Sequence, residues 1–134
     1  MRQYDNFYEC KPLIFESIKN ILKNKVVGVY EDFIPINNPN NVPLVVYSCN
    51  DLQFTTRATD GSVACGSFVL SIDLFTTNKD EIEEVGKLLI SEYNCAYVEN
   101  KEWRLAQILF TSQHTEITDN NLYLTTFNFS VTLG

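Results

Sequence analysis

The chain has 134 residues, of which 45% are hydrophobic and 20% charged, a composition typical of a folded globular protein and too apolar for a disordered one. Ten lysines and arginines stand against 17 aspartates and glutamates, and the net charge of −7 argues against duplex DNA binding, which calls for a basic stripe. The apolar runs are too short to span a bilayer, and the first residues lack the apolar core of a secretory signal, so we expect neither. The length predicts one domain, residues 1–134.

Residues 7–24 have the spacing of an amphipathic helix. Its apolar positions recur at intervals of three and four, and they are Leu13, Ile14, Ile18, Ile21 and Leu22. Pro12 fits the first turn of a helix, so we expect the regular helix to begin there. A short strand is predicted over residues 26–30.

Residues 31–41 are predicted to form a loop, because they contain two prolines and four asparagines. The loop also carries Phe33, Ile34, Pro35 and Ile36, which is more apolar surface than a solvent loop needs. Two interpretations stay open. These side chains fold back onto the core, or they make an intermolecular contact.

The middle of the chain predicts strands over residues 42–49, 53–59 and 63–75, with Asp60 and Gly61 forming the turn between the last two. Apolar and polar residues alternate in the third strand, which predicts one face on a core and one polar face. Leu70 and Ile72 are therefore expected to be buried. Gly66 is a candidate position for a bulge.

A second helix is predicted over residues 76–93, where Asn78 and Glu81 match a capping box. Its buried stripe is expected to consist of Ile82, Val85, Leu89 and Tyr93. Gly86 would let this helix lie close to a sheet.

A turn region follows to residue 102, then a strand over 103–111, a polar loop and a final strand over 121–133. This order predicts an α+β fold, with a single antiparallel or mixed β-sheet and two amphipathic helices packed on it.

Few residues point to chemistry. Cys10, Cys49, Cys65 and Cys95 are widely separated, so we expect reduced thiols and no zinc site. His114, the only histidine, falls in the predicted polar loop, where a solvated side chain is a better interpretation than a general base. No phosphate-binding glycine loop or nucleophile elbow is present. We expect no catalytic residues, no cofactor and no metal.

The order of elements resembles the tail terminator, or tail-completion, proteins of long-tailed bacteriophages. The resemblance rests on an opening amphipathic helix, a strand reading Pro43-Leu44-Val45-Val46-Tyr47, an alternating strand that runs into a capped helix over Ser67–Glu84, and a closing strand over Tyr123–Leu133. It covers most of the chain and consists of element order and hydrophobic pattern, without an invariant chemical motif.

The resemblance implies a non-enzymatic virion protein of the tail, assembled in the host cytoplasm. Such proteins form a ring, usually a hexamer, that stops tail-tube polymerisation and meets the head-completion protein. Self, the tail-tube protein and the head-completion protein are then the expected partners, with neither sequence-specific nucleic acid binding nor a membrane. The acidic balance fits a channel through which DNA slides. The expected ring contacts are Phe33, Ile34, Pro35 and Ile36, together with Asp60 and Gly61.

Three other interpretations stay open. The chain could be a tail-tube or head–tail connector component, or a non-viral α+β protein-binding module. The third is an enzyme that uses His114 or a cysteine.

Overall fold

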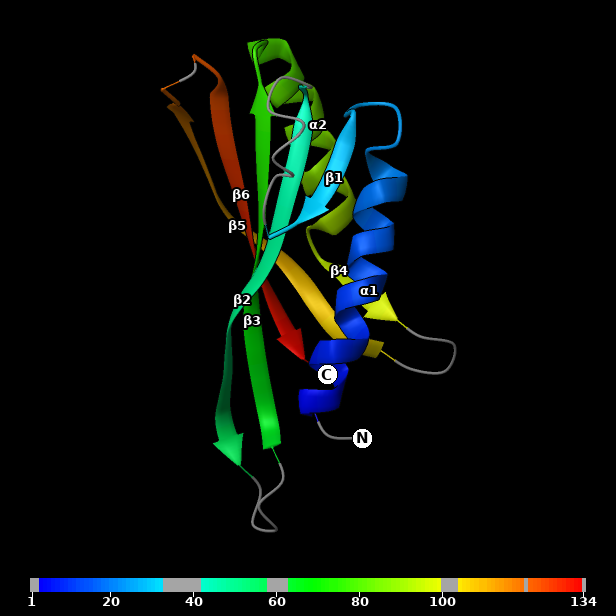
Figure 1. Cartoon of the computed structure of the whole chain (residues 1–134). Helices are drawn as coiled ribbons and strands as arrows, with labels where there is room; N and C mark the ends of the chain where they lie inside the picture. Colours follow the sequence, from blue (N-terminus) through cyan, green and yellow to red (C-terminus); the bar gives the residue numbers. More distant parts are fainter. Residues whose placement is uncertain (1–2, 33–41, 58–62, 100–103, 120, 134) are drawn as a thin grey trace.

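The computed structural model describes residues 3–32, 42–57, 63–99, 104–119 and 121–133, and these contain two helices and six strands. In chain order the elements are α1 (Gln3–Ile21), β1 (Gly28–Glu31), β2 (Leu44–Arg57), β3 (Val63–Thr76), α2 (Lys79–Tyr93), β4 (Ala96–Glu99), β5 (Arg104–Ile117) and β6 (Tyr123–Leu133). The strands form one curled sheet in the order β1-β2-β3-β6-β5-β4 (Figure 1).

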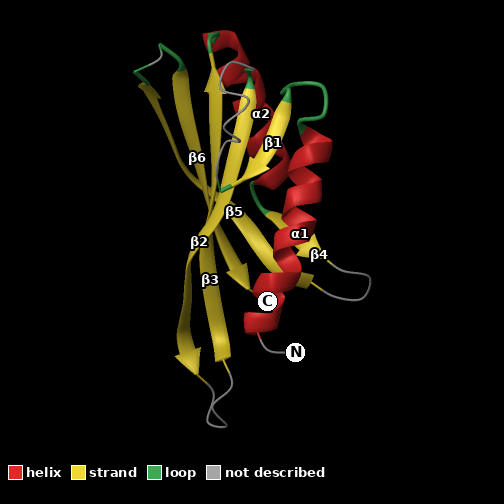
Figure 2. Ribbon diagram, viewed as in Figure 1, coloured by secondary structure: helices red, strands yellow, loops and turns green. Residues whose placement is uncertain are grey.

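The sheet is mixed, because β1 runs parallel to β2 while every other neighbouring pair is antiparallel. Both helices lie along the same side of the sheet, and its other side carries no helix among the described residues (Figure 2). The predicted α+β fold with two amphipathic helices on one sheet is confirmed.

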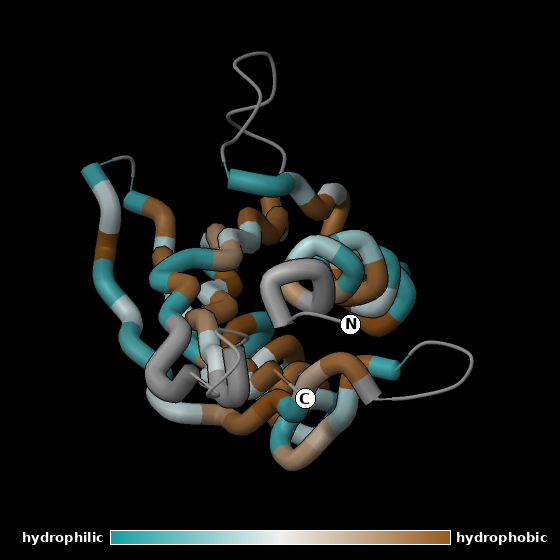
Figure 3. The backbone as a smooth tube through the Cα atoms, turned by 90° about the horizontal axis from the view of Figure 1, so that it is seen from below, coloured by the Kyte–Doolittle hydropathy of each residue, from teal (hydrophilic) through white to brown (hydrophobic). Residues whose placement is uncertain are grey.

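Alternation along the two central strands builds the core. β3 and β6 pair with Leu70 opposite Phe129 and Ile72 opposite Phe127, and all four side chains are fully buried. Seen from below, hydrophobic and hydrophilic residues alternate along these strands while the helices run beside them (Figure 3). The predicted burial of Leu70 and Ile72 is confirmed, because their strand turns every second residue towards the helices.

α1 begins earlier than predicted. It continues through Pro12, which lies exposed inside the helix, and its first turns are held by Phe7. The Phe7 ring meets the Phe68 ring edge to face, with 5.0 Å between their centroids. This packing offsets the backbone hydrogen bond that a proline inside a helix cannot make. The buried stripe also differs from the prediction, since Leu13 is 38% exposed while Cys10 is fully buried.

The start of α2 is capped as the sequence predicts, with one difference. The Asn78 side chain accepts from the Asp80 N–H at 2.9 Å. The Glu81 carboxylate accepts from the Thr76 hydroxyl at 3.0 Å, and Thr76 in turn accepts from the Asn78 N–H at 3.2 Å. The reciprocal bond of a capping box is thus relayed through a buried threonine.

Gly86 brings α2 close to the sheet, as predicted. A Cβ placed there would lie 3.1 Å from the Phe127 ring, tighter than ordinary van der Waals contact. The stripe of Ile82, Val85, Leu89 and Tyr93 is buried as expected. The Tyr93 hydroxyl also donates to Ser17 of α1 at 2.9 Å, so α2 is joined to both the sheet and the other helix.

Three strand predictions need correction. β2 is one strand over Leu44–Arg57 rather than two, because its pairing with β3 continues past register shifts between Asn50 and Gln53 and between Phe54 and Thr56. The second shift lies where Gly66 pairs with Phe54, and the extra residue is on β2. Residues 96–99 form strand β4 where a turn was expected.

β5 is the third correction. It runs to Ile117, six residues past the predicted end, so His114 lies in a strand rather than in a loop. His114 pairs with Thr126 of β6. The polar stretch after Phe110 lacks the alternation that is typical of a strand. Its extended conformation is stabilised instead by pairing with β6.

Candidate functional site

The sequence-predicted contact residues Phe33, Ile34, Pro35 and Ile36, and the turn residues Asp60 and Gly61, lie outside the described residues. Residues 33–41 connect β1 to β2, and residues 58–62 connect β2 to β3. Their proposed role as contacts therefore stays a prediction. The surfaces described below lie on other parts of the chain.

The first surface is the side of β3, β6 and β5 that faces away from the helices, here called the open face. Its polar residues are Ser67, Ser71, Asp73, Thr126, Asn128, Ser130, Thr132, Gln107, Ser112, His114 and Glu116, and the register also places Val69, Phe75, Leu109 and Leu124 on it. Hydrogen bonds cross it between strands. Ser71 donates to the Asn128 side chain at 2.8 Å, and Asn128 donates to Ser112 at 3.1 Å.

The Asp73 carboxylate on the same face accepts from the Thr126 hydroxyl at 2.7 Å. Because hydroxyls and amides satisfy one another across the strands, the centre of the open face is polar without being strongly charged. Asp73 and Glu116 are its acidic groups. Such a surface can lie beside another macromolecule without offering a described basic side chain to which an anionic group could bind.

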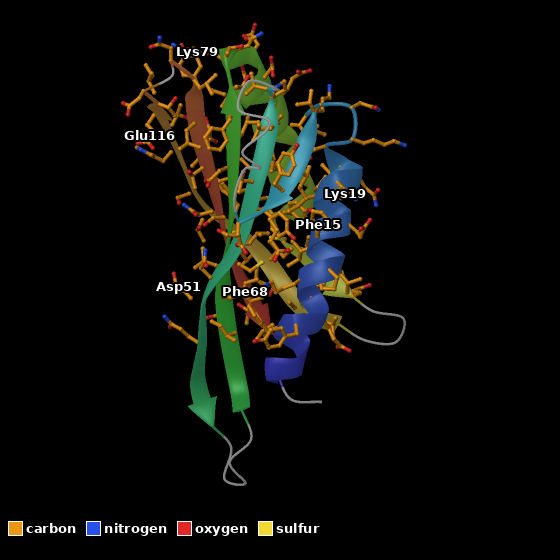
Figure 4. The ribbon with its side chains drawn as sticks, viewed as in Figure 1. Phe15, Lys19, Asp51, Phe68, Lys79 and Glu116 are labelled. Carbon is orange, nitrogen blue, oxygen red and sulfur yellow. The ribbon has the colours of Figure 1, made fainter. Side chains whose placement is uncertain are left out.

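Basic side chains have a contrasting distribution. All six that the structure describes belong to α1, to the turn after it or to α2, and they are Lys11, Lys19, Lys23, Lys25, Lys79 and Lys87. Four of them form ion pairs, among which Lys25 joins Glu84 of α2 at 3.1 Å. Lys79 lies 5.6 Å from the centre of the Tyr123 ring. None of the six thus belongs to a strand of the open face, and Figure 4 shows Lys19 on α1, across the sheet from Glu116.

A pocket separates α1 from the end of α2 and β4. Its walls include Leu13, Ile21, Tyr93 and Val98, and Glu92 lies at its edge. Leu13 lines this pocket and is partly exposed there. This part of the apolar stripe of α1 therefore faces the pocket and is not covered by the core. The Tyr93–Ser17 hydrogen bond crosses the pocket wall.

The second surface is the outer edge of β5. Its first residues pair with β4, whereas Leu109 to Ile117 have no further strand beside them among the described residues. Beside this edge two hollows adjoin between α2 and β5, and Glu83 and Gln113 line both. Gly86 and Ile90 line one hollow, while Ile82 and Thr115 line the other.

The described thiols and the histidine lie on separate parts of the fold, with Cys10 on α1, Cys49 on β2, Cys95 just before β4 and His114 on β5. Burial raises the pKa of Cys10 to about 12 and that of Cys49 to about 11, so both thiols stay protonated near neutral pH. Cys10, Cys49 and Cys95 are free, and the Cys65 side chain lies outside the described part. His114 is exposed on the open face, with Thr126 opposite it in β6.

In the described part of the chain, no group of three or more histidine, cysteine, aspartate and glutamate side chains is arranged to hold a metal ion. Neither described helix is long and apolar enough to cross a membrane.

Sequence reasoning predicted one of the two surfaces in part. The alternation along residues 63–75 predicts a polar face, but not that both helices leave it uncovered. The β5 edge had no usable signal, because residues 111–117 are polar and read as a loop.

Comparison with known proteins gives a match in fold. No protein-family model matches the chain, and no curated protein does. Twenty-four chains of solved structures match. One of them, from a structure described as "Virion of native gene transfer agent (GTA) particle", is 13% identical with a TM-score of 0.56, and the match covers 98% of this chain and 91% of that one. The chain thus has the fold of a protein found in a phage-like virion.

Proposed function

We propose that the chain is a structural subunit of a phage-like virion that ends tail-tube polymerisation and forms part of the tail-to-head joining interface. The support is a fold similarity that spans nearly the whole chain and nearly the whole of a virion protein. The order of elements resembles that of tail terminator proteins, which agrees with this role. The proposed action is non-enzymatic.

The observation that carries the proposal is the contrast between the two sides of the sheet. A subunit in a ring around a DNA channel needs one surface that does not bind phosphate, because counterion release makes every cationic contact attractive to DNA. The open face has no basic residue among its described side chains and carries Asp73 and Glu116. In the proposed ring this face is turned to the channel, and the lysine-bearing helices are turned outward.

The test is assembly with the tail-tube protein of the same particle. Purified chain is added at increasing ratios to polymerising tube protein, and tube lengths are measured by electron microscopy. A terminator shortens the tubes and is found at one end of each. Incorporation along the whole length would instead make it a tube component. No effect on length and no binding would contradict the proposal and favour a protein-binding module.

The orientation of the ring has its own test. Ser130→Lys places a cation on the open face, while Asn20→Lys places the same charge on the exposed side of α1. In capped tubes a lysine that faces the channel is shielded from immobilised duplex DNA, so we expect only Asn20→Lys to increase retention on a DNA column. Equal retention of both variants would contradict the orientation.

A further inference from the structure

The unpaired part of β5 directs backbone groups outward. The Thr118 N–H donates to the Leu122 carbonyl at 2.8 Å, so Thr118 faces β6. Because groups alternate along an antiparallel ladder, the N–H and C=O of Gln113, Thr115 and Ile117 point away from β6. Earlier in β5, the Phe110 N–H also points away from β6, and it donates a hydrogen bond to the Asn94 side-chain oxygen at 3.2 Å. The side chain of Asn94 thus satisfies the edge just before β4 begins, and from there to Ile117 no described strand does so.

From Ser112 onward this edge lacks lysine, proline and bulges, three protections that proteins use against unwanted pairing; its register shift lies before that, between Phe110 and Ser112. From Ser112 to Ile117 the pairing with β6 is continuous, and the segment contains no lysine or proline. The free edge of β2 differs. It is broken by a register shift between Asn50 and Gln53, and Asp51 there has a φ of 58°. A bulge twists an edge away from a straight partner, and the two strands at the ends of the sheet, β1 and β4, have only four residues each, so β5 offers the longest uninterrupted edge among the described strands.

We propose that this edge binds the same edge of a second copy of the chain, antiparallel and around a two-fold axis at Thr115. Thr115 then lies opposite Thr115, His114 opposite Glu116, and Gln113 opposite Ile117 of the second copy. The three residues whose backbone groups point outward meet their three counterparts, so each forms the reciprocal hydrogen bonds of an antiparallel pair.

The side chains complement one another in this register. On the open face, the imidazole of His114 meets the carboxylate of Glu116 from the second copy, an arrangement that occurs twice by symmetry. Both side chains are exposed in the single chain. Figure 4 shows Glu116 on the side of the sheet away from α1.

On the opposite face, the pair covers the most exposed of the large hydrophobic side chains. Ile117 is 69% exposed. In the proposed register it lies beside Gln113 of the other copy, which lines the hollow with Gly86 and Ile90. An exposed apolar side chain thus lies next to a hollow that Gly86 and Ile90 line together with the longer side chains of Glu83 and Lys87.

The pair goes beyond the ring of the proposed function and does not depend on it. A two-fold contact occupies the edge in both copies and cannot extend into a cyclic ring. It therefore describes the subunit before assembly, with the exposed edge covered until the pair separates.

The first experiment measures solution mass by light scattering and amide hydrogen exchange by NMR, on the full chain over a range of concentrations. The expected result is a monomer–dimer equilibrium. Amides of Gln113, Thr115 and Ile117 gain protection as concentration rises, while those of Ser112, His114 and Glu116, bonded to β6, stay protected throughout. A monomer at every concentration, or a dimer without this period-two pattern, overturns the pair.

Charge reversal provides the second experiment. His114→Glu places two glutamates opposite each other, and we expect dimerisation to weaken about tenfold. The double variant His114→Glu/Glu116→Lys should restore it, while Thr132→Glu, on the same side of the sheet but away from the edge, should leave it unchanged. Ile117→Ser should also weaken the dimer without lowering the melting temperature. Failure of the double variant to recover overturns the proposed register.

The outcomes separate the two proposals. A discrete ring in solution that protects the β5 edge overturns the two-fold pair and leaves the terminator role standing. A two-fold dimer that never caps tubes supports the pair and contradicts the terminator role.

Discussion

The two sides of the sheet are formed by the same strands but differ in burial and in what they contribute to stability. Towards the helices, β3 and β6 present side chains that are fully buried, such as Leu70 and Phe127. Away from them, the intervening residues are partly exposed and satisfy one another, as Ser71 does with Asn128. The buried side therefore holds most of the stability, and the open face can be changed for function at low cost.

The largest expected effect tests the buried side. Leu70→Ala removes a fully buried side chain from the centre of the core and should lower the free energy of unfolding by about 2–5 kcal/mol. Its neighbour Ser71→Ala, on the open face, loses one hydrogen bond and should cost about 1 kcal/mol. Denaturant unfolding measures both. Equal losses in the two variants would contradict the division between the two sides.

A polar group on the buried side should matter more than one on the open face. Thr76 is fully buried and relays the cap of α2, so Thr76→Val leaves the Asn78 N–H and the Glu81 carboxylate without this partner. We expect a loss of about 1–3 kcal/mol in the same assay. The matched control is Thr126→Val, whose hydroxyl bonds Asp73 on the open face. A larger loss in the control would reverse the expected order.

Ionisation provides a pH test of the buried side. Burial raises the pKa of the Cys10 thiol from 9.0 to about 12 and that of Tyr93 to about 12. Between pH 9 and 12 the unfolded chain therefore loses protons that the folded chain keeps, and stability falls as the pH rises.

The expected slope from Cys10 is at most about 1.4 kcal/mol per pH unit. Cys10→Ala should flatten it, as measured by denaturant unfolding at several pH values. Val85→Ala, which also opens the core but removes no ionisable group, should lower stability equally at every pH. A Cys10→Ala profile as steep as that of the unmodified chain would contradict the assignment.

The smallest expected effect lies on the helix surface. Lys25→Ala removes the ion pair with Glu84, in which both side chains are well exposed, and should cost less than about 1 kcal/mol. Raising the salt concentration should shrink the difference further, because salt screens exposed pairs. The measurement is the melting temperature at low and high salt. A loss as large as that of Leu70→Ala would show that this contact holds the two helices together.

Much of the fold could be predicted from local patterns. The strict alternation of β3 and β6 predicted their length and their buried face, and Asn78 predicted where α2 begins. The failures share a cause. α1 passes through Pro12 because Phe7 packs on Phe68, and β5 continues past Thr111 because β6 pairs with it. Both depend on contacts between residues far apart in the chain.

The predicted contact residues in segment 33–41 and the turn at Asp60 and Gly61 stay predictions. The edge of β5 could not be predicted at all, because an edge exists only once strand order is known. β4 begins only at Ala96, opposite Ile108, because α2 ends at Tyr93, and Leu109 to Ile117 therefore have no strand beside them among the described residues.

The sequence by itself determined the class of the fold, most of the residues that enter the core and the acidic balance, because hydrophobic periodicity and composition are local properties of the chain. Only the tertiary structure decided that both helices cover the same side, that the described lysines lie away from the open face and that residues 112–117 of β5 have no described strand beside them. These features follow from which elements become neighbours, and that choice depends on burying apolar surface over the whole molecule at once.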